Sequence, residues 1–174
     1  NEAIQAYYGF QIDLNTSFTG EDSLDVSIDA GNAAGSEFDL NNGGTADILY
    51  VDGVSYTFPV GPATVFVGDN MDGSTLYSTA CVYGGPSNTL DDCGNGNSAM
   101  AGGAGTAAGV SYEFGDGFAV ALGYTGDGSS TNGLMTTEGT DVIGGQLSYT
   151  GDSYGAYITM SSTEDYSGVD DDRN

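Results

Sequence analysis

Residues 114–124 read FGDGFAVALGY, and this stretch decides the fold. In its second half large apolar side chains alternate with Ala or Gly, the period of two residues that is typical of a β-strand. The preceding segment Gly115–Gly117 suits a tight turn, because its Gly and Asp residues tolerate a positive φ. A second segment of this kind, Gly151–Ser153, follows further along the chain. Both segments predict β-hairpins.

The same alternation recurs over most of the chain, whereas the helical period of 3.6 residues is nearly absent. Gly, Ser, Thr, Asp, Asn, Val and Tyr are plentiful, as in strands joined by turns. We therefore expect an all-β fold in a single domain over residues 1–174. The predicted strands are Tyr7–Asn15, Ser23–Ala30, Asp47–Phe58, Ala63–Gly68, Gly105–Phe114, Phe118–Tyr124, Asp141–Thr150 and Tyr154–Ser161.

The connections between the predicted strands alternate strictly between short and long. The short ones are Thr16–Asp22, Pro59–Pro62, Gly115–Gly117 and Gly151–Ser153. The long ones are Gly31–Ala46, Asp69–Ala104 and Thr125–Thr140. Short turns on one side and long loops on the other are typical of an antiparallel up-and-down β-barrel in an outer membrane. The pattern predicts such a barrel, or the front part of a larger one. A soluble β-sandwich built from hairpins is the alternative.

The chain is strongly acidic, with a formal net charge of -24 and Arg173 as its only basic residue. Nucleic-acid binding needs Lys or Arg to neutralise phosphates, so this class of function is excluded. Small cations and hydrophilic solutes are the natural partners of so acidic a protein. The acidity is also explained if it only keeps a secreted protein soluble.

The residue inventory argues against an enzyme. Without His or Lys, the chain cannot build a Ser-His-Asp triad, a Schiff base or a P-loop. Only carboxylate pairs remain, such as Asp91-Asp92 and Glu21-Asp22, which could in principle act as a glycosidase pair. Acid pairs in turns are usually solvated surface groups, so we expect no catalytic residue.

The two cysteines, Cys81 and Cys93, lie in one polar, Gly-rich stretch. Such a stretch has no core to bury a thiol, so we expect a disulfide that closes this loop in an oxidising compartment. The chain starts at Asn1 without a leader, and we expect a mature or trimmed form. No apolar run approaches the roughly 20 residues of a membrane helix, so any membrane contact is expected through strands.

Several ordered stretches resemble one family, the cyanobacterial outer-membrane porins that carry a surface-layer-homology domain ahead of a barrel. Leu14–Leu24, LNTSFTGEDSL, resembles a strand–turn–strand unit of these porins, and Val54–Gly61, VSYTFPVG, resembles a turn that follows it. Weaker similarities are Ala30–Asn32, Thr64–Gly68, Tyr83-Gly84 and Gly102–Tyr112. The resemblance implies a homo-oligomeric barrel in the outer membrane that passes inorganic ions and nutrients by diffusion.

The chain departs from that family in three ways. It has no surface-layer-homology domain or coiled-coil linker, and it ends before a larger barrel would close, so we expect a truncated or processed chain. It also has almost no Lys or Arg, whereas pores of this kind usually mix charges. The third departure puts the usual solute range of the family in doubt.

Strand alternation also predicts which side chains would line a pore. If the apolar side meets lipid, the polar side faces inward. The predicted pore-lining residues are Gln11, Asp13, Asn15, Asp25, Ser27 and Asp29. Carboxylates around a water-filled path concentrate cations and repel anions, so we expect a preference for cations. On the alternative interpretation these residues face bulk water on one side of a soluble sheet.

Ca²⁺ is the only cofactor that the residues suggest, because hard cations prefer oxygen ligands. The candidate ligands are Asp69 and Asp72 in one loop and Asp170, Asp171 and Asp172 near the end of the chain. The first loop lacks the alternate spacing and the closing Glu of an EF-hand. Ordinary turns rich in Asp, Asn and Gly are the alternative.

Three hypotheses follow. The leading one is an outer-membrane, porin-like channel. The second is a secreted surface or filament protein, whose unpaired edge strands join copies of the chain. The third is a soluble Ca²⁺-dependent module that binds carbohydrate or adheres to surfaces.

Overall fold

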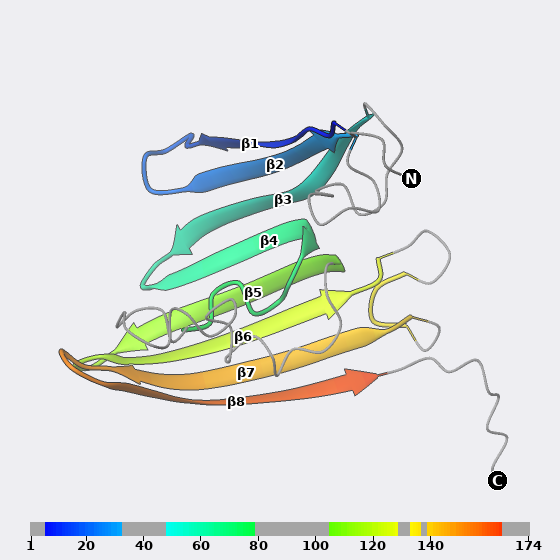
Figure 1. The fold of residues 1–174 in the computed structure, drawn as a ribbon. Coiled ribbons are helices and arrows are strands. Elements are labelled where there is room, and N and C mark those ends of the chain that lie inside the picture. Colours follow the sequence, from blue (N-terminus) through cyan, green and yellow to red (C-terminus); the bar gives the residue numbers. More distant parts are fainter. Residues whose placement is uncertain (1–5, 33–47, 79–104, 129–132, 137–138, 165–174) are drawn as a thin grey trace, which may run out of the picture. The chain divides into compact units, whose positions relative to one another are not determined.

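The computed structural model describes residues 6–32, 48–78, 105–128, 133–136 and 139–164. Every regular element within these ranges is a strand (Figure 1). The strands are β1 (Gly9–Thr16), β2 (Ser23–Gly31), β3 (Ile48–Val60), β4 (Ala63–Met71), β5 (Gly105–Phe114), β6 (Phe118–Gly126), β7 (Asp141–Thr150) and β8 (Gly155–Glu164). Each predicted strand is present, and its ends differ from the prediction by only a few residues.

The strands form one eight-stranded sheet in the order β1-β2-β3-β4-β5-β6-β7-β8, so that each strand pairs with its neighbour in sequence. The pairings of β1 with β2 and of β4 through β8 are antiparallel. The all-β, up-and-down prediction is therefore confirmed. The order ends on β1 and β8, and no pairing between them occurs in the described part of the chain. Closure into a barrel stays a prediction.

The chain separates into two compact units, unit 1 over residues 1–56 and unit 2 over residues 57–174. The boundary falls within β3, and each unit is described by itself below. The single domain expected from the length of the chain stays a prediction. None of the described residues belongs to a helix that is long and apolar enough to cross a membrane.

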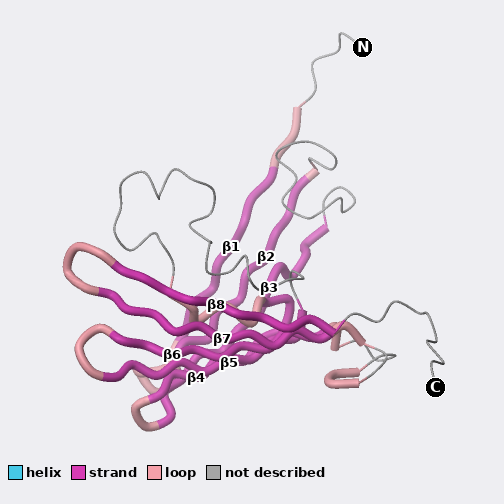
Figure 2. The backbone as a smooth tube through the Cα atoms, turned by 90° about the horizontal axis from the view of Figure 1, so that it is seen from below, coloured by secondary structure: helices cyan, strands magenta, loops and turns pink. Residues whose placement is uncertain are grey.

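The short turns of unit 2 lie together at one end of its strands (Figure 2). In the β5–β6 turn Gly117 has a φ of +86°, which residues with a side chain rarely adopt. Its carbonyl accepts a hydrogen bond of 2.7 Å from the Thr150 amide at the end of β7. A Cβ at Gly117 would lie 2.2 Å from the Thr150 carbonyl oxygen, so this contact also requires glycine.

The two faces of the sheet in unit 2 differ in size and in exposure. One face, which we call the open apolar face, carries large side chains that stay exposed. They are Val120, Leu122, Ile143, Leu147, Ile158 and Met160. On the other face most residues of β6 and β7 are small or polar, and they are largely buried. The buried apolar residues in the described part of the unit are Phe66, Tyr77, Ala107, Ala121 and Val142.

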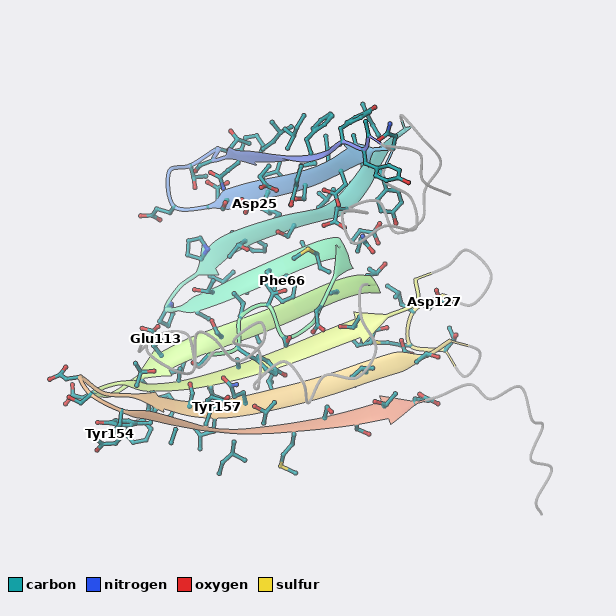
Figure 3. All side chains as sticks on the ribbon, in the orientation of Figure 1. Asp25, Phe66, Glu113, Asp127, Tyr154 and Tyr157 are labelled. Carbon is teal, nitrogen blue, oxygen red and sulfur yellow. The ribbon has the colours of Figure 1, made fainter. Side chains whose placement is uncertain are left out.

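Phe66 of β4 is the largest fully buried side chain in the described part of the chain (Figure 3). It lies over Gly109 of β5, where an added Cβ would come within 2.4 Å of its ring. Among the described residues of unit 2, few other large side chains are buried with it, so these residues form little apolar core. Most of their bulky apolar side chains are exposed instead.

Candidate functional site

The six residues predicted to line a pore share one face of the β1–β2 hairpin in unit 1. The register pairs Gln11 with Asp29, Asp13 with Ser27, and Asn15 with Asp25. Directly paired residues of an antiparallel hairpin point to the same side. We call this set the polar face; Asp25 is labelled on it in Figure 3. The opposite face carries Phe10, Ile12 and Leu14, all of them exposed.

Hydrogen bonds connect most of the polar face. Near the turn, the Asn15 amide donates to the Asp25 carboxylate at 2.5 Å and to the Ser23 hydroxyl at 2.6 Å. The Ser23 hydroxyl in turn donates to the other Asp25 oxygen at 2.7 Å. Both Asp25 oxygens are therefore satisfied by neutral donors, which leaves the negative charge of the carboxylate without a counterion in this group.

Further from the turn, the Gln11 amide donates to the Asp13 carboxylate at 2.9 Å and to the Ser27 hydroxyl at 2.7 Å. The Ser27 hydroxyl donates to the same Asp13 oxygen. The Gln11 side-chain nitrogen thus donates both of its protons to Asp13 and Ser27, and none to Asp29, the residue directly across from it. Asp29 is only 5% exposed, and its Oδ1 atom has no hydrogen-bond partner among the residues that the structure describes.

Asp22, in the short β1–β2 turn, organises the end of this hairpin. Its Oδ1 accepts from the Ser17 hydroxyl at 2.6 Å and from both the amide and the hydroxyl of Thr19, at 2.7 and 2.6 Å. Its Oδ2 accepts from the Tyr56 hydroxyl of β3 at 2.6 Å. These donors, with Ser17 first, hold the pKa of the Asp22 carboxyl well below its usual range.

The expectation that the Glu21-Asp22 pair is solvated is therefore wrong for Asp22. Its side chain is buried at 8% exposure, whereas Glu21 is exposed. The Asp22 carboxylate stabilises the turn, because each of its oxygens accepts a hydrogen bond, and it does not face water beside Glu21. Sequence alone offered one signal, the Ser17 and Thr19 hydroxyls a few residues before it, which commonly pair with Asp in turns.

In unit 2, residues 72–78 leave β4 and cross the small, polar face of β6 and β7. We call this stretch the crossing segment. At its start the Gly73 amide donates to the Thr125 hydroxyl of β6 at 2.6 Å. At its end the Ser78 amide donates to the Gln146 side chain of β7 at 2.7 Å, and the Gln146 amide donates back to the Ser78 carbonyl at 3.2 Å. The segment is fixed to two neighbouring strands.

Tyr77 is the apolar anchor of the crossing segment. It is 5% exposed and forms a buried cluster with Ala121 of β6 and Val142 of β7. Next to it the Ser78 hydroxyl bonds to that of Ser148 at 2.9 Å. The sequence predicted only a long connection over Asp69–Ala104, and not where its first part lies. The Ala and Gly residues that alternate along β6 were the one sequence feature that could have indicated this position, since small side chains let another segment of backbone lie close to the strand.

Gly123 of β6 makes this approach possible, and its substitution should displace the crossing segment. A Cβ at this position would lie 1.9 Å from the Gly73 carbonyl oxygen, a backbone atom that cannot rotate aside. We expect Gly123→Ala to break the bonds that Gly73 and Ser78 make to the sheet, at a cost of about 1–3 kcal/mol each. Hydrogen exchange of these two amides should accelerate tenfold or more, since about 1.4 kcal/mol corresponds to a factor of ten.

Gly145→Ala of β7 is the matched control for this prediction. A Cβ there would meet the flexible end of Leu122 at 3.1 Å, on the open apolar face. Exchange at Gly73 and Ser78 should then stay as in the parent protein. Unchanged exchange in Gly123→Ala would show that the segment does not lie against β6.

The predicted calcium ligands do not converge within the described residues. Asp69 of β4 accepts a hydrogen bond from the Thr106 hydroxyl at 3.0 Å, and Asp72 accepts from the Ser74 amide at 2.8 Å. In the part of the chain that the structure describes, no three acidic, His or Cys side chains form a group that could hold a metal ion. Asp170, Asp171 and Asp172 lie outside the described residues, as do Asp91-Asp92, Cys81 and Cys93.

A row of aromatic rings, which we call the aromatic row, lies at the short-turn end of unit 2 and was not predicted. Its members are Tyr112, Phe114, Phe118, Tyr149 and Tyr154. Successive ring centroids lie 6.2, 5.9, 4.9 and 5.7 Å apart. Tyr154, labelled in Figure 3, lies in the β7–β8 turn and is 67% exposed. The row therefore crosses the ends of neighbouring strands, from β5 to the β7–β8 turn.

Comparison of the chain with protein-family models, curated proteins and solved structures finds no match in any of the three.

Proposed function

We propose that the chain forms a membrane-spanning β-sheet pore of the outer-membrane type, through which ions and small hydrophilic solutes diffuse with a preference for cations. One observation carries the proposal: in unit 2 the large apolar side chains are exposed while the small and polar face opposite them is covered. A soluble sandwich has the reverse arrangement, because its apolar faces pack against each other.

The open apolar face continues across neighbouring strands, and its side chains are exposed throughout. The register pairs Val120 with Leu147 and Leu147 with Ile158, and all three are exposed. In water, a patch of this kind marks a surface that contacts another protein or a membrane. Transmembrane strands present such a band to the hydrocarbon of the bilayer.

The aromatic row favours lipid over a protein partner. Transmembrane barrels carry girdles of aromatic residues at both interfaces, where the rings meet the headgroups. The five rings lie at the end of the unit that bears the short turns, and short turns are typical of the periplasmic side. A protein partner would not require the aromatic residues to gather at this one end.

The polar face supplies the ion preference. It carries Asp13, Asp25 and Asp29, and the described part of the chain contains no basic side chain. Uncompensated carboxylates beside water raise the local concentration of cations.

The proposal predicts a cation-selective conductance. Purified protein in a planar lipid bilayer, under a tenfold KCl gradient, should give a reversal potential of cationic sign in the range of tens of millivolts, below the ideal limit of about 59 mV. Bilayers with detergent alone are the control. Anion selectivity would contradict the role given to the carboxylates, and the absence of any conductance would contradict the pore itself.

A second candidate is a self-assembling surface or filament protein. It is favoured by the two end strands of the sheet, β1 and β8, which are not paired with each other in the described residues. Edge strands of this kind pair readily with another chain. Sedimentation separates the two candidates, since filaments pellet from plain buffer, whereas a membrane pore stays dispersed only in detergent or lipid.

A further inference from the structure

Asp29 differs from every other acid of the polar face. Asp13 and Asp25 each accept hydrogen bonds from neighbouring Gln, Asn or Ser side chains. Asp29 is 95% removed from solvent, since only 5% of it is exposed, and its Oδ1 accepts from no donor in the described residues. A buried carboxylate oxygen without a donor is costly, so it calls for a positive partner.

The described part of the chain offers no such partner. It contains neither Lys nor His, and its one basic residue, Arg173, lies outside the described residues. The charged groups that act on Asp29 are the carboxylates of Asp52 on β3 and Asp13 on β1, and both repel it. Carboxylates thus repel Asp29 from both neighbouring strands, and a proton or a cation would offset this repulsion.

We infer that Asp29, with Asp13 beside it, is the position at which the polar face takes up a partly hydrated divalent cation such as Ca²⁺ or Mg²⁺. The ion would lose the waters that Asp29 and Asp13 replace and keep the others, because the described residues hold no group of three carboxylates that could chelate it fully. Mg²⁺ in particular is commonly bound through one or two carboxylates and several waters. Such a site holds an ion weakly enough to release it, which conduction requires.

As a selectivity site for the pore, the inference rests on the proposed function, whereas the binding of the ion does not. Both parts are tested with the full chain in detergent or lipid and with CaCl₂ as the probe. Asp29→Asn removes the charge without removing a hydrogen bond at Oδ1. Asp25→Asn is the matched control, because it removes one charge from the same strand and the same face, at a carboxylate that already has its donors.

We expect equilibrium dialysis against ⁴⁵Ca²⁺ at physiological salt to show one bound ion per chain in the parent and in Asp25→Asn. In Asp29→Asn this binding should weaken on the order of tenfold or more. Reversal potentials under a CaCl₂ gradient should shift toward zero much further in Asp29→Asn than in Asp25→Asn, which removes one carboxylate of the polar face but leaves the site intact. Circular dichroism of both variants shows whether the strands are retained.

Equal loss in the two variants would overturn the inference, because it would show a diffuse ion atmosphere in place of a site. Unchanged binding in Asp29→Asn would overturn it as well, and would leave a proton as the partner of the buried oxygen. If the protein binds Ca²⁺ through Asp29 but never conducts, the pore proposal fails and the site stands. If it conducts with identical selectivity in both variants, the site fails and the pore stands.

Discussion

Met160→Arg should prevent the protein from inserting into lipid vesicles. Met160 is 74% exposed on the open apolar face. It pairs with Gly145 of β7, which pairs with Leu122 of β6, so it lies in the middle row of the strands. On the proposed function this row faces the centre of the bilayer, where Arg on a barrel costs about 2–4 kcal/mol. Folding into vesicles, followed by urea titration and by heat-modifiable migration on gels, measures the loss.

Ser161→Arg, at the next residue of β8, is the matched control. Neighbouring residues of a strand point to opposite faces, so this change places the same charge on the side assigned to water. Ser161 is exposed, and we expect vesicle insertion close to that of the parent. A result in which both variants insert equally would contradict the assignment of the open apolar face to lipid.

This pair of variants also separates the pore from a soluble protein. In water, a change at a position as exposed as Met160 usually alters stability by less than about 0.5 kcal/mol. A charge there would improve solubility. The same substitution is thus nearly neutral in one environment and strongly destabilising in the other, which makes its outcome decisive.

The strands and their order were predictable because they depend on local features. Period-two alternation marks the strands, and the Gly-rich turns at Gly115–Gly117 and Gly151–Ser153 end them within a residue or two. Alternation also placed Asp13 and Ser27 on one face, since pairing across a short turn fixes the register. Each of these inferences needs information from residues that are close in the sequence.

The position of the crossing segment could not be predicted from the sequence, because its contacts join residues that are far apart in the chain. Ser78 and Gln146 are separated by 68 positions, and no local sequence pattern around either residue indicates that they are in contact. The isolation of Asp29 was equally hidden. The register places Gln11 opposite Asp29, but the Gln11 amide turns toward Asp13 and Ser27. Such choices depend on side-chain geometry, which alternation does not determine.

Asp22→Ala should open the β1–β2 turn. The change removes the acceptor of hydrogen bonds from the Ser17 and Tyr56 hydroxyls, and it leaves the Phe18 and Thr19 amides, which donate to Asp22 at 3.1 and 2.7 Å, without their partner. Because bonds to a charged acceptor are the stronger ones, we expect amide exchange at Phe18 and Thr19 to accelerate about tenfold or more. Phe18, which packs edge-on against Tyr56 with ring centroids 6.2 Å apart, should become mobile with them.

Acid should reproduce the effect of this mutation in the parent protein. The folded-state pKa of Asp22 lies below its unfolded value, so the folded state prefers the charged carboxylate. The stabilisation is complete above the unfolded pKa of about 3.9 and is lost as the pH falls below it toward the folded value. Exchange at Phe18 and Thr19 should therefore be protected at neutral pH and lose its protection in strong acid, after correction for the intrinsic pH dependence of exchange.

Asp116→Ala, in the exposed β5–β6 turn, is the control for a lost surface carboxylate, and it should leave exchange at Phe18 and Thr19 unchanged. The Asp22→Ala protein should show no further loss of protection at these amides as the pH falls from neutral to strongly acidic. If its protection still declined with acid as steeply as that of the parent, another carboxylate would have to govern the turn. The hydrogen-bond pattern around Asp22 would then not account for its stability.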